Sequence, residues 1–144
     1  MKILLVSLML LLNTSPEWLT DFDTAKAIAT SEHKYILLNF SGSDWCGPCI
    51  KMKKEVFESD SFLSIATKQL VLVRADFPRS KKNQLAAPQI KHNEVLAEKY
   101  NSEGKFPFTL LLDQNGNILK HWDGYVFASQ DKFIADLQKT LASR

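Results

Sequence analysis

Short apolar runs alternate with longer amphipathic stretches along the chain. Apolar runs of about four to eight residues between turn signals predict buried strands. Such runs lie at 35–40, 70–76 and 108–113, and ILKHWDG at 118–124 is expected to return beside the last one. Apolar residues that recur every three or four positions predict helices at about 21–33, 46–58, 61–68, 90–100 and 129–141. In the second helix, the expected inward face is Ile50, Met52, Val56 and Phe57.

The order of these elements indicates an α/β fold with one mixed sheet. The strands at 35–40 and 70–76 are joined through helices, so they should be parallel, because a parallel pair needs a crossover connection. Asn115-Gly116 is a strong signal for a hairpin with a two-residue loop, which would add antiparallel strands. The polar stretch 77–88 is predicted to be a loop. Helices on both faces would then cover the sheet.

The composition fits one soluble domain. The chain has 144 residues, of which 45% are hydrophobic and 24% charged, and this length suffices for a core of its own. A net charge of +2 gives no reason to expect nucleic acid as a partner. The basic residues that gather are too few for a phosphate-tracking stripe and are interpreted as a solvated loop; they are Arg79, Lys81, Lys82 and the more distant Lys91.

The first sixteen residues differ from the rest of the chain. Met1 and Lys2 precede an apolar run at 3–12, and polar residues follow up to Pro16. This pattern is typical of a secretory signal peptide and is too short to cross a bilayer as a mature helix. A buried N-terminal helix or strand is the alternative. We therefore expect a signal peptide at 1–16 and a domain at 17–144 that is periplasmic or secreted, where disulfide chemistry is permitted.

Cys46 and Cys49 are the only cysteines in the chain. A structural zinc site needs about four ligands, and no histidine lies at ligand spacing to another or to the cysteines, so no metal is expected. The histidines are His33, His92 and His121. A structural disulfide between residues three apart would constrain little of the unfolded chain. Two inert, buried thiols stay possible, because free cysteine packs as a small hydrophobe.

Gly47 and Pro48, which separate the cysteines, favour a reactive pair. Proline suits the first turn of a helix and glycine allows a tight turn, so the pair is predicted where a strand-to-helix loop becomes a helix. The N–H groups and dipole at a helix start stabilise a thiolate and lower its pKa. Positions three apart share a helix face, so the sulfurs can meet. Cys46 is the outer, more exposed candidate nucleophile, and Cys49 is the candidate resolving thiol.

Three segments together resemble the thioredoxin family. They are WCGPC at 45–49, YILLNF before it and FPFTLLLDQNGNILKHWDGY after it, and the resemblance covers residues 21–141. It implies a thioredoxin fold, in which helices flank both faces of a central mixed sheet. It also implies a thiol–disulfide oxidoreductase whose redox-active centre is the Cys46–Cys49 pair, with no other cofactor. Cys46 would attack a substrate disulfide, and Cys49 would resolve the mixed disulfide.

The resemblance also implies a substrate-binding surface around the cysteines. Pro107 would be cis and face the cysteines, and Phe106 would offer backbone groups to an extended substrate. Gly124 would lie on the same surface. The predicted substrate-binding residues are Trp45, Gly47, Pro48, Phe106, Pro107 and Gly124. Without the resemblance, Pro107 is an ordinary strand-start proline and Gly124 an ordinary turn glycine.

The chain departs from the family pattern at three positions. Asn39 stands where the family has a buried aspartate, and an amide cannot accept that proton. The lysine that accompanies the aspartate would fall near Leu72. Lys54 replaces the proline that kinks the motif helix. Proton transfer is therefore expected to use water or a carboxylate, and the candidates Asp44 and Glu55 are first interpreted as solvated.

The segments SGSDW and KMKKEVF resemble secreted bacterial thioredoxin-like proteins, including C-terminal domains of periplasmic reductant carriers. The prediction is a monomeric reductase of protein disulfides in the bacterial cell envelope. Its partners would be protein thiols and disulfides and an upstream membrane or soluble redox partner, and no nucleic acid. Gly-Pro between the cysteines favours reduction over oxidation or isomerisation. The alternative, motivated by Asn39 and Leu72, is a peptide-binding module with vestigial cysteines.

Overall fold

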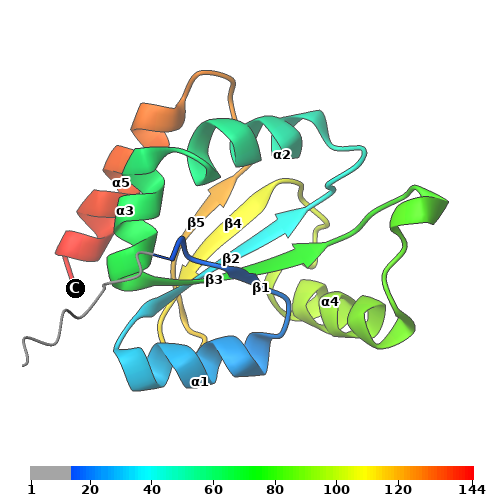
Figure 1. Cartoon of the computed structure of the whole chain (residues 1–144), viewed down its shortest axis with the longest axis horizontal. Coiled ribbons are helices and arrows are strands. Elements are labelled where there is room, and N and C mark those ends of the chain that lie inside the picture. The colour runs from blue at the N-terminus through cyan, green and yellow to red at the C-terminus, as the bar shows by residue number, and fades with distance from the viewer. Residues whose placement is uncertain (1–13) are drawn as a thin grey trace, which may run out of the picture.

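The computed structural model describes residues 14–144, in which five strands form one mixed sheet between two layers of helices (Figure 1). The sheet order is β1-β3-β2-β4-β5. The strands are β1 (Trp18–Leu19), β2 (Tyr35–Ser41), β3 (Leu70–Asp76), β4 (Phe108–Leu112) and β5 (Ile118–Asp123). The helices are α1 (Phe22–Glu32), α2 (Gly47–Met52), α3 (Asp60–Gln69), α4 (Ala87–Tyr100) and α5 (Gln130–Ala142). A π-helical segment (Lys53–Phe57) continues α2, and a short 3-10 turn (Lys81–Asn83) lies in the loop after β3.

The pairing of the strands confirms the predicted α/β fold. β2 and β3 run parallel, from the pair Tyr35 and Leu70 to the pair Ser41 and Asp76. β4 pairs antiparallel with both β2 and β5. Because β2 is buried on both faces, it reads as a nearly continuous apolar run, which is why the strand was predictable.

Two hydrophobic cores lie on opposite faces of the sheet. One face packs against α1 and α4, with Phe22, Leu96 and Tyr100 from the helices. The other packs against α2, α3 and α5, with Phe62 and Leu137 from the helices. Figure 1 shows the two helix layers on either side of the strands. This arrangement leaves the carboxyl ends of β2 and β3 at one edge of the sheet. The loop 42–46, which leads into the cysteine helix and is called the motif loop below, begins there, as does the loop after β3.

The hairpin between β4 and β5 is confirmed, but its predicted two-residue loop is wrong. The Gly116 N–H donates to the carbonyl of Asp113 at 3.0 Å, and the Asp113 N–H donates to the carbonyl of Asn117 at 3.0 Å. Gly116, with φ 84°, therefore ends a longer turn instead of sitting at its centre. The Asp113 carboxylate accepts N–H bonds from Asn115 and Asn117 and so stabilises the longer loop.

Three local predictions need correction. β1 was not predicted, because two residues are too few for a periodic signal; Trp18 pairs with Leu72. Ile50 was expected to face inward, but it is 48% exposed, because the helix turns Cys49 and Met52 toward the core instead. The fourth helix begins at Ala87, within the predicted loop, with Pro88 in its first turn.

The predicted signal peptide at 1–16 lies almost entirely outside the described residues and stays a prediction. Between residues 14 and 144, no helix is both long enough and apolar enough to cross a membrane.

Candidate functional site

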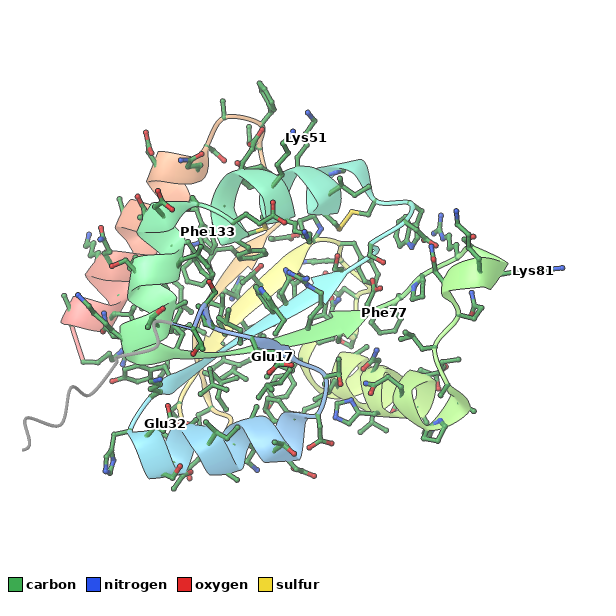
Figure 2. All side chains as sticks on the ribbon, viewed as in Figure 1. Glu17, Glu32, Lys51, Phe77, Lys81 and Phe133 are labelled. Carbon is green, nitrogen blue, oxygen red and sulfur yellow. A yellow bond between two sulfur atoms is a disulfide. The ribbon has the colours of Figure 1, made fainter. Side chains whose placement is uncertain are left out.

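Cys46 and Cys49 form a disulfide at the start of α2, with their Cα atoms 5.2 Å apart (Figure 2). Cys46 is the N-cap residue of α2, and Pro48 lies in the first turn. The Cys49 N–H donates to the Cys46 sulfur at 3.3 Å. The pair thus lies where the sequence predicted it, at the point where a loop becomes a helix, and a helix N–H already points at the first sulfur.

Exposure does not distinguish the two cysteines in this disulfide form. Cys46 is 5% exposed and Cys49 is 4% exposed, so the expected greater exposure of Cys46 is not evident. Gly47 and Pro48 between them are exposed. The difference between the cysteines is therefore positional, since Cys46 caps the helix and Cys49 lies within it.

Trp45 holds the motif loop in place through three neighbours. Its indole N–H donates to the carbonyl of Phe77 at 2.7 Å. Its ring packs so closely on Gly42 that a Cβ there would lie 2.4 Å from the indole, which explains why glycine occupies that position. The guanidinium of Arg79 lies 3.6 Å from the ring centroid on the indole face. The sequence interpretation of Arg79 as part of a solvated loop missed this contact.

Asp44 anchors the loop after β3 to the motif loop. Its carboxylate accepts hydrogen bonds from the N–H groups of Arg79 and Ser80, each at 2.9 Å, and from the side-chain amide of Asn83 at 3.0 Å. These bonds, the one from Arg79 first, lower the pKa of the Asp44 carboxyl. The interpretation of Asp44 as a merely solvated carboxylate is therefore wrong, and its oxygens are occupied rather than free to accept a thiol proton.

Pro107 lies at the same edge of the sheet as the cysteines. The Phe106–Pro107 peptide bond is cis, as the resemblance implied. Phe108 pairs with Phe40 near the end of β2, so Pro107 lies beside the start of the motif loop. The Gly124 N–H donates to the Pro107 carbonyl at 2.9 Å, and Gly124 has a φ of 75°, which favours glycine.

The aromatic side chains at this edge form a continuous strip. The rings of Trp45 and Phe106 are 5.4 Å apart, and those of Phe106 and Phe77 are also 5.4 Å apart. From Phe77 and Phe106, a groove of about 540 Å³ continues along α4, with Glu94 and Glu98 among its lining residues. An extended peptide could therefore lie along the strip beside the disulfide.

A buried polar chain lies beneath the motif helix. Asn39 is 2% exposed, and its amide donates to the Thr109 hydroxyl at 3.1 Å. The Thr109 hydroxyl in turn points at the sulfur of Met52, 3.9 Å away, which is a weak acceptor. The chain links β2, β4 and α2 without a carboxylate, in accordance with the amide at position 39.

The residue beside Asn39 on the neighbouring strand is Arg74. Leu72, near which the family's lysine is expected to fall, pairs with Leu37, and the register places Arg74 opposite Asn39. The Arg74 guanidinium lies 4.1 Å from the centroid of the Trp18 ring. Burial lowers the pKa of Arg74, although an arginine stays charged at neutral pH. Its Nε has no hydrogen-bond partner within residues 14–144.

Glu55 ties the motif helix to the segment after Gly124. Its carboxylate accepts a hydrogen bond from the Tyr125 hydroxyl, so Glu55 is not simply solvated. Burial and this bond raise the pKa of Tyr125. Lys54, which stands in place of the family's kink proline, lies in the π-helical segment, so a π-bulge rather than a proline interrupts the α-helical ladder here.

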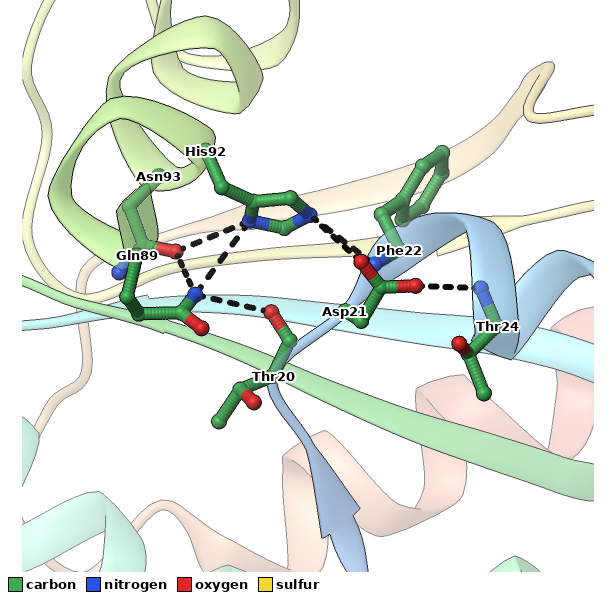
Figure 3. A network of polar contacts seen from close by, with 7 residues as sticks. All are labelled: Thr20, Asp21, Phe22, Thr24, Gln89, His92 and Asn93. Carbon is green, nitrogen blue, oxygen red and sulfur yellow. Dashed lines mark hydrogen bonds and ion pairs between the residues drawn. The ribbon is translucent and has the colours of Figure 1, made fainter. Parts of the chain in front are cut away.

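The three histidines lie in separate parts of the fold. His33 ends α1 with a φ of 55°, and His121 lies on β5 beside Phe108. His92 lies on α4, where its Nε2 accepts the Phe22 N–H at 3.1 Å (Figure 3). Within the described part of the chain, no group of three His, Cys, Asp or Glu side chains could hold a metal ion.

Sequence reasoning missed Gly42, Arg79 and Arg74 as parts of this site. Arg74 had a detectable signal, because a charged residue inside the apolar run LVLVRAD needs an explanation. The sequence carries no such signal for Gly42 or Arg79, since their contacts with Trp45 depend on how two loops meet.

Comparison with known proteins gives consistent matches. A family model described as thioredoxin-like matches residues 17–114. The disulfide bond reductase DsbH of Chlamydia pneumoniae is 39% identical over 88 residues, which are 61% of this chain and 51% of that protein. The thioredoxin-related protein DsbJ of the same organism is 37% identical over 60 residues, 42% of this chain and 17% of that protein. The chain thus spans about half the length of the first relative and less of the second.

Solved structures agree with this result. A DsbH oxidoreductase superposes with a TM-score of 0.77 at 27% identity, covering 91% of this chain and 88% of that one. A thioredoxin from Thermus thermophilus superposes with a TM-score of 0.63 at 16% identity, covering 89% of this chain and 88% of that one. At the lower identity, the likeness concerns the fold alone.

Proposed function

The chain belongs to the thioredoxin-like family, and on that premise we propose that it is a thiol–disulfide oxidoreductase that reduces protein disulfides. The observation that carries the proposal is the Cys46–Cys49 disulfide at the start of α2, with a helix N–H donating to the Cys46 sulfur. In the reduced protein, the same N–H would stabilise a Cys46 thiolate, because helix N-termini lower thiol pKa values.

The proposed reaction has two exchange steps. The Cys46 thiolate attacks one sulfur of a substrate disulfide, forms a mixed disulfide and releases the other substrate sulfur as a thiolate. The Cys49 thiolate then attacks the Cys46 sulfur and releases the second substrate thiolate. The substrate gains two electrons and the protein is left with the Cys46–Cys49 disulfide. A dithiol partner upstream must reduce that disulfide before the next cycle.

The predicted substrate-binding residues support this role by their placement. Trp45, Phe106, cis-Pro107 and Gly124 lie at the edge of the sheet that carries the cysteines. An extended substrate would run along the aromatic strip, with Gly47 and Pro48 exposed beside the disulfide. The reducing direction is supported by the Gly-Pro pair and by the similarity to the disulfide bond reductase DsbH. The predicted signal peptide supports a place in the cell envelope.

Insulin reduction with dithiothreitol tests the activity. The native protein should accelerate reduction, and Cys46→Ser should show the uncatalysed rate. Cys49→Ser should accumulate mixed disulfides with client proteins on Cys46, detectable by mass spectrometry. A folded native protein that does not accelerate the reaction would contradict the proposal. Binding of partner peptides that is unchanged when both cysteines are serine, together with inactivity, would favour the peptide-binding module instead.

A further inference from the structure

A cationic lobe projects beside the proposed redox pair. We use "the lobe" for residues 77–83, which leave the carboxyl end of β3 and include the 3-10 turn Lys81–Asn83. Its cations Arg79, Lys81 and Lys82 are exposed, and within residues 14–144 none of them forms an ion pair with a carboxylate. Figure 2 shows Lys81 at the tip of the lobe, directed away from the body of the protein.

The base of the lobe is fixed relative to the cysteines. Asp44 binds the N–H groups of Arg79 and Ser80, and the guanidinium of Arg79 stacks 3.6 Å from the ring centroid of Trp45, the residue before Cys46. Trp45 in turn contacts Phe106 in the aromatic strip. A positive charge is therefore held at the end of the strip nearest the disulfide.

Two carboxylates at the base of the lobe offset part of this charge, and hydrogen bonds within the protein engage both of them. Asp44 is occupied by three donors of the lobe. Asp76 accepts from the N–H and hydroxyl of Ser43 and from the N–H of Phe77. Two further carboxylates, Glu94 and Glu98, line the groove beyond Phe77. The charge therefore changes sign along the strip, from positive at Arg79 to negative along α4.

We propose that the lobe is a docking surface for protein substrates that carry acidic residues beside their reactive disulfide. The proposal rests on the proposed function and names the class of substrate. Complementary charges around a site raise the rate of encounter and suppress partners of the wrong sign. An acidic segment near the substrate disulfide would meet Arg79 and the two lysines, while the apolar strip takes the chain itself.

The test compares three disulfide peptides that differ only in the two residues beside one cysteine: Asp-Asp, Asn-Asn or Lys-Lys. The second-order rate of reduction by the reduced protein is measured for each peptide in dilute buffer and in molar salt. The uncharged bis(2-hydroxyethyl) disulfide serves as a reference for exchange itself. At low salt, we expect the acidic peptide to react about tenfold faster than the basic one, and the ratio to approach one in molar salt, where the Debye length is about 3 Å.

Two variants locate the effect. Lys81→Gln with Lys82→Gln should together lower the acidic-to-basic ratio by about threefold, a size expected for exposed charges in water. Arg79→Gln should lower it as well, but this change also removes the stack on Trp45. The matched control is Lys68→Gln with Lys139→Gln, on exposed positions of α3 and α5 away from the lobe, which should leave all rates unchanged.

The outcomes separate the two proposals. Equal rates for the three peptides, or a preference for the basic one, would overturn the docking surface while leaving the oxidoreductase intact. Failure to reduce even the uncharged disulfide would count against the proposed function. In that case, the Cys46→Ser, Cys49→Ser double variant still tests docking by fluorescence anisotropy of labelled peptides. Tighter binding of the acidic peptide that weakens in the Lys81→Gln, Lys82→Gln background would support the surface, and equal binding of all three would reject it.

Discussion

The two sides of the disulfide are built differently. Beneath it, the floor consists of Asn39, Thr109 and Met52, which are all buried and joined by one hydrogen bond at each step. Beside it, the lobe is exposed, and its anchor Asp44 accepts three hydrogen bonds. Each polar group of the floor is thus held by few hydrogen bonds and buried away from solvent. The carboxylate that anchors the lobe has three hydrogen-bond donors and lies near the surface.

Because of this difference, we expect the floor to contribute to the stability of the whole fold and the contacts of the lobe to position a surface loop. A buried group that loses its only partner bears the full desolvation cost, whereas an exposed group can turn to water. We therefore expect changes in the floor to lower the free energy of unfolding, and changes in the lobe to loosen a surface loop. Three substitutions, ordered by the size of the expected effect, test this contrast.

Thr109→Val should give the largest loss of stability. Valine keeps the shape but removes the hydroxyl that accepts from Asn39, so a buried amide N–H loses its partner. We expect unfolding in urea at pH 7 to show a loss of about 1–3 kcal/mol. Thr67→Val is the matched control, since its hydroxyl donates to the carbonyl of Leu63 on the exposed side of α3, and it should change stability by less than about 0.5 kcal/mol. Equal losses would refute the contrast.

The contrast also separates what the sequence could predict from what it could not. The strands β2 and β3 and the helix start at the cysteines are local patterns, and the structure places them as expected. The cis bond before Pro107 was predictable only through the family resemblance. In each case, neighbouring residues in the chain carry the signal.

Contacts that depend on register or on the meeting of loops were not predictable. Arg74 lies beside Asn39 because of the register in which β2 and β3 pair. A register shifted by two residues would have placed Leu72 beside Asn39 instead. The stack of Arg79 on Trp45 joins residues 34 positions apart across two irregular loops. The inward orientation expected for Ile50 is wrong for another reason. The helix turns Cys49 and Met52 toward the core, which leaves Ile50 exposed.

Tyr125→Phe should give an intermediate effect, because this side chain is half-buried, whereas Thr109 is fully buried. It removes the hydroxyl that donates to Glu55, and we expect a loss of about 0.5–1.5 kcal/mol in the free energy of unfolding. The folded protein raises the pKa of Tyr125 above its ordinary value of 10.0. The contribution of its hydroxyl to the free energy of unfolding is therefore fully present below pH 10 and is lost as pH rises further.

Denaturant unfolding of the native protein and the Tyr125→Phe variant between pH 6 and pH 11 measures this difference. The gap should stay constant up to about pH 10 and shrink above it. Tyr35→Phe is the control, since the Tyr35 hydroxyl makes no hydrogen bond within residues 14–144, and it should show no such gap. A gap for Tyr125 that grows with pH would contradict the proposed contact.

Asp44→Asn should have the smallest effect on global unfolding and a clear local one. Asparagine keeps one acceptor oxygen but loses the charge, so the N–H groups of Arg79 and Ser80 lose their strongest partner while water is close by. Hydrogen exchange followed by NMR should therefore show faster exchange of these two amides, with the urea midpoint nearly unchanged. Asp131→Asn, in the first turn of α5, is the control and should leave both amides protected.

Acid should reproduce this loosening in the native protein. The hydrogen bonds from the lobe lower the pKa of Asp44 below 3.8. The stabilisation that the ionised carboxylate gives the lobe is therefore present above that pH and is lost as pH falls through the lowered value. Protection of Arg79 and Ser80 should thus persist at pH 4 and decline at more acidic pH, while Asp44→Asn shows no such step. If Asp44→Asn instead lowered the urea midpoint as much as Thr109→Val, the lobe would be part of the folding core, and the distinction between anchored surface and buried floor would fail.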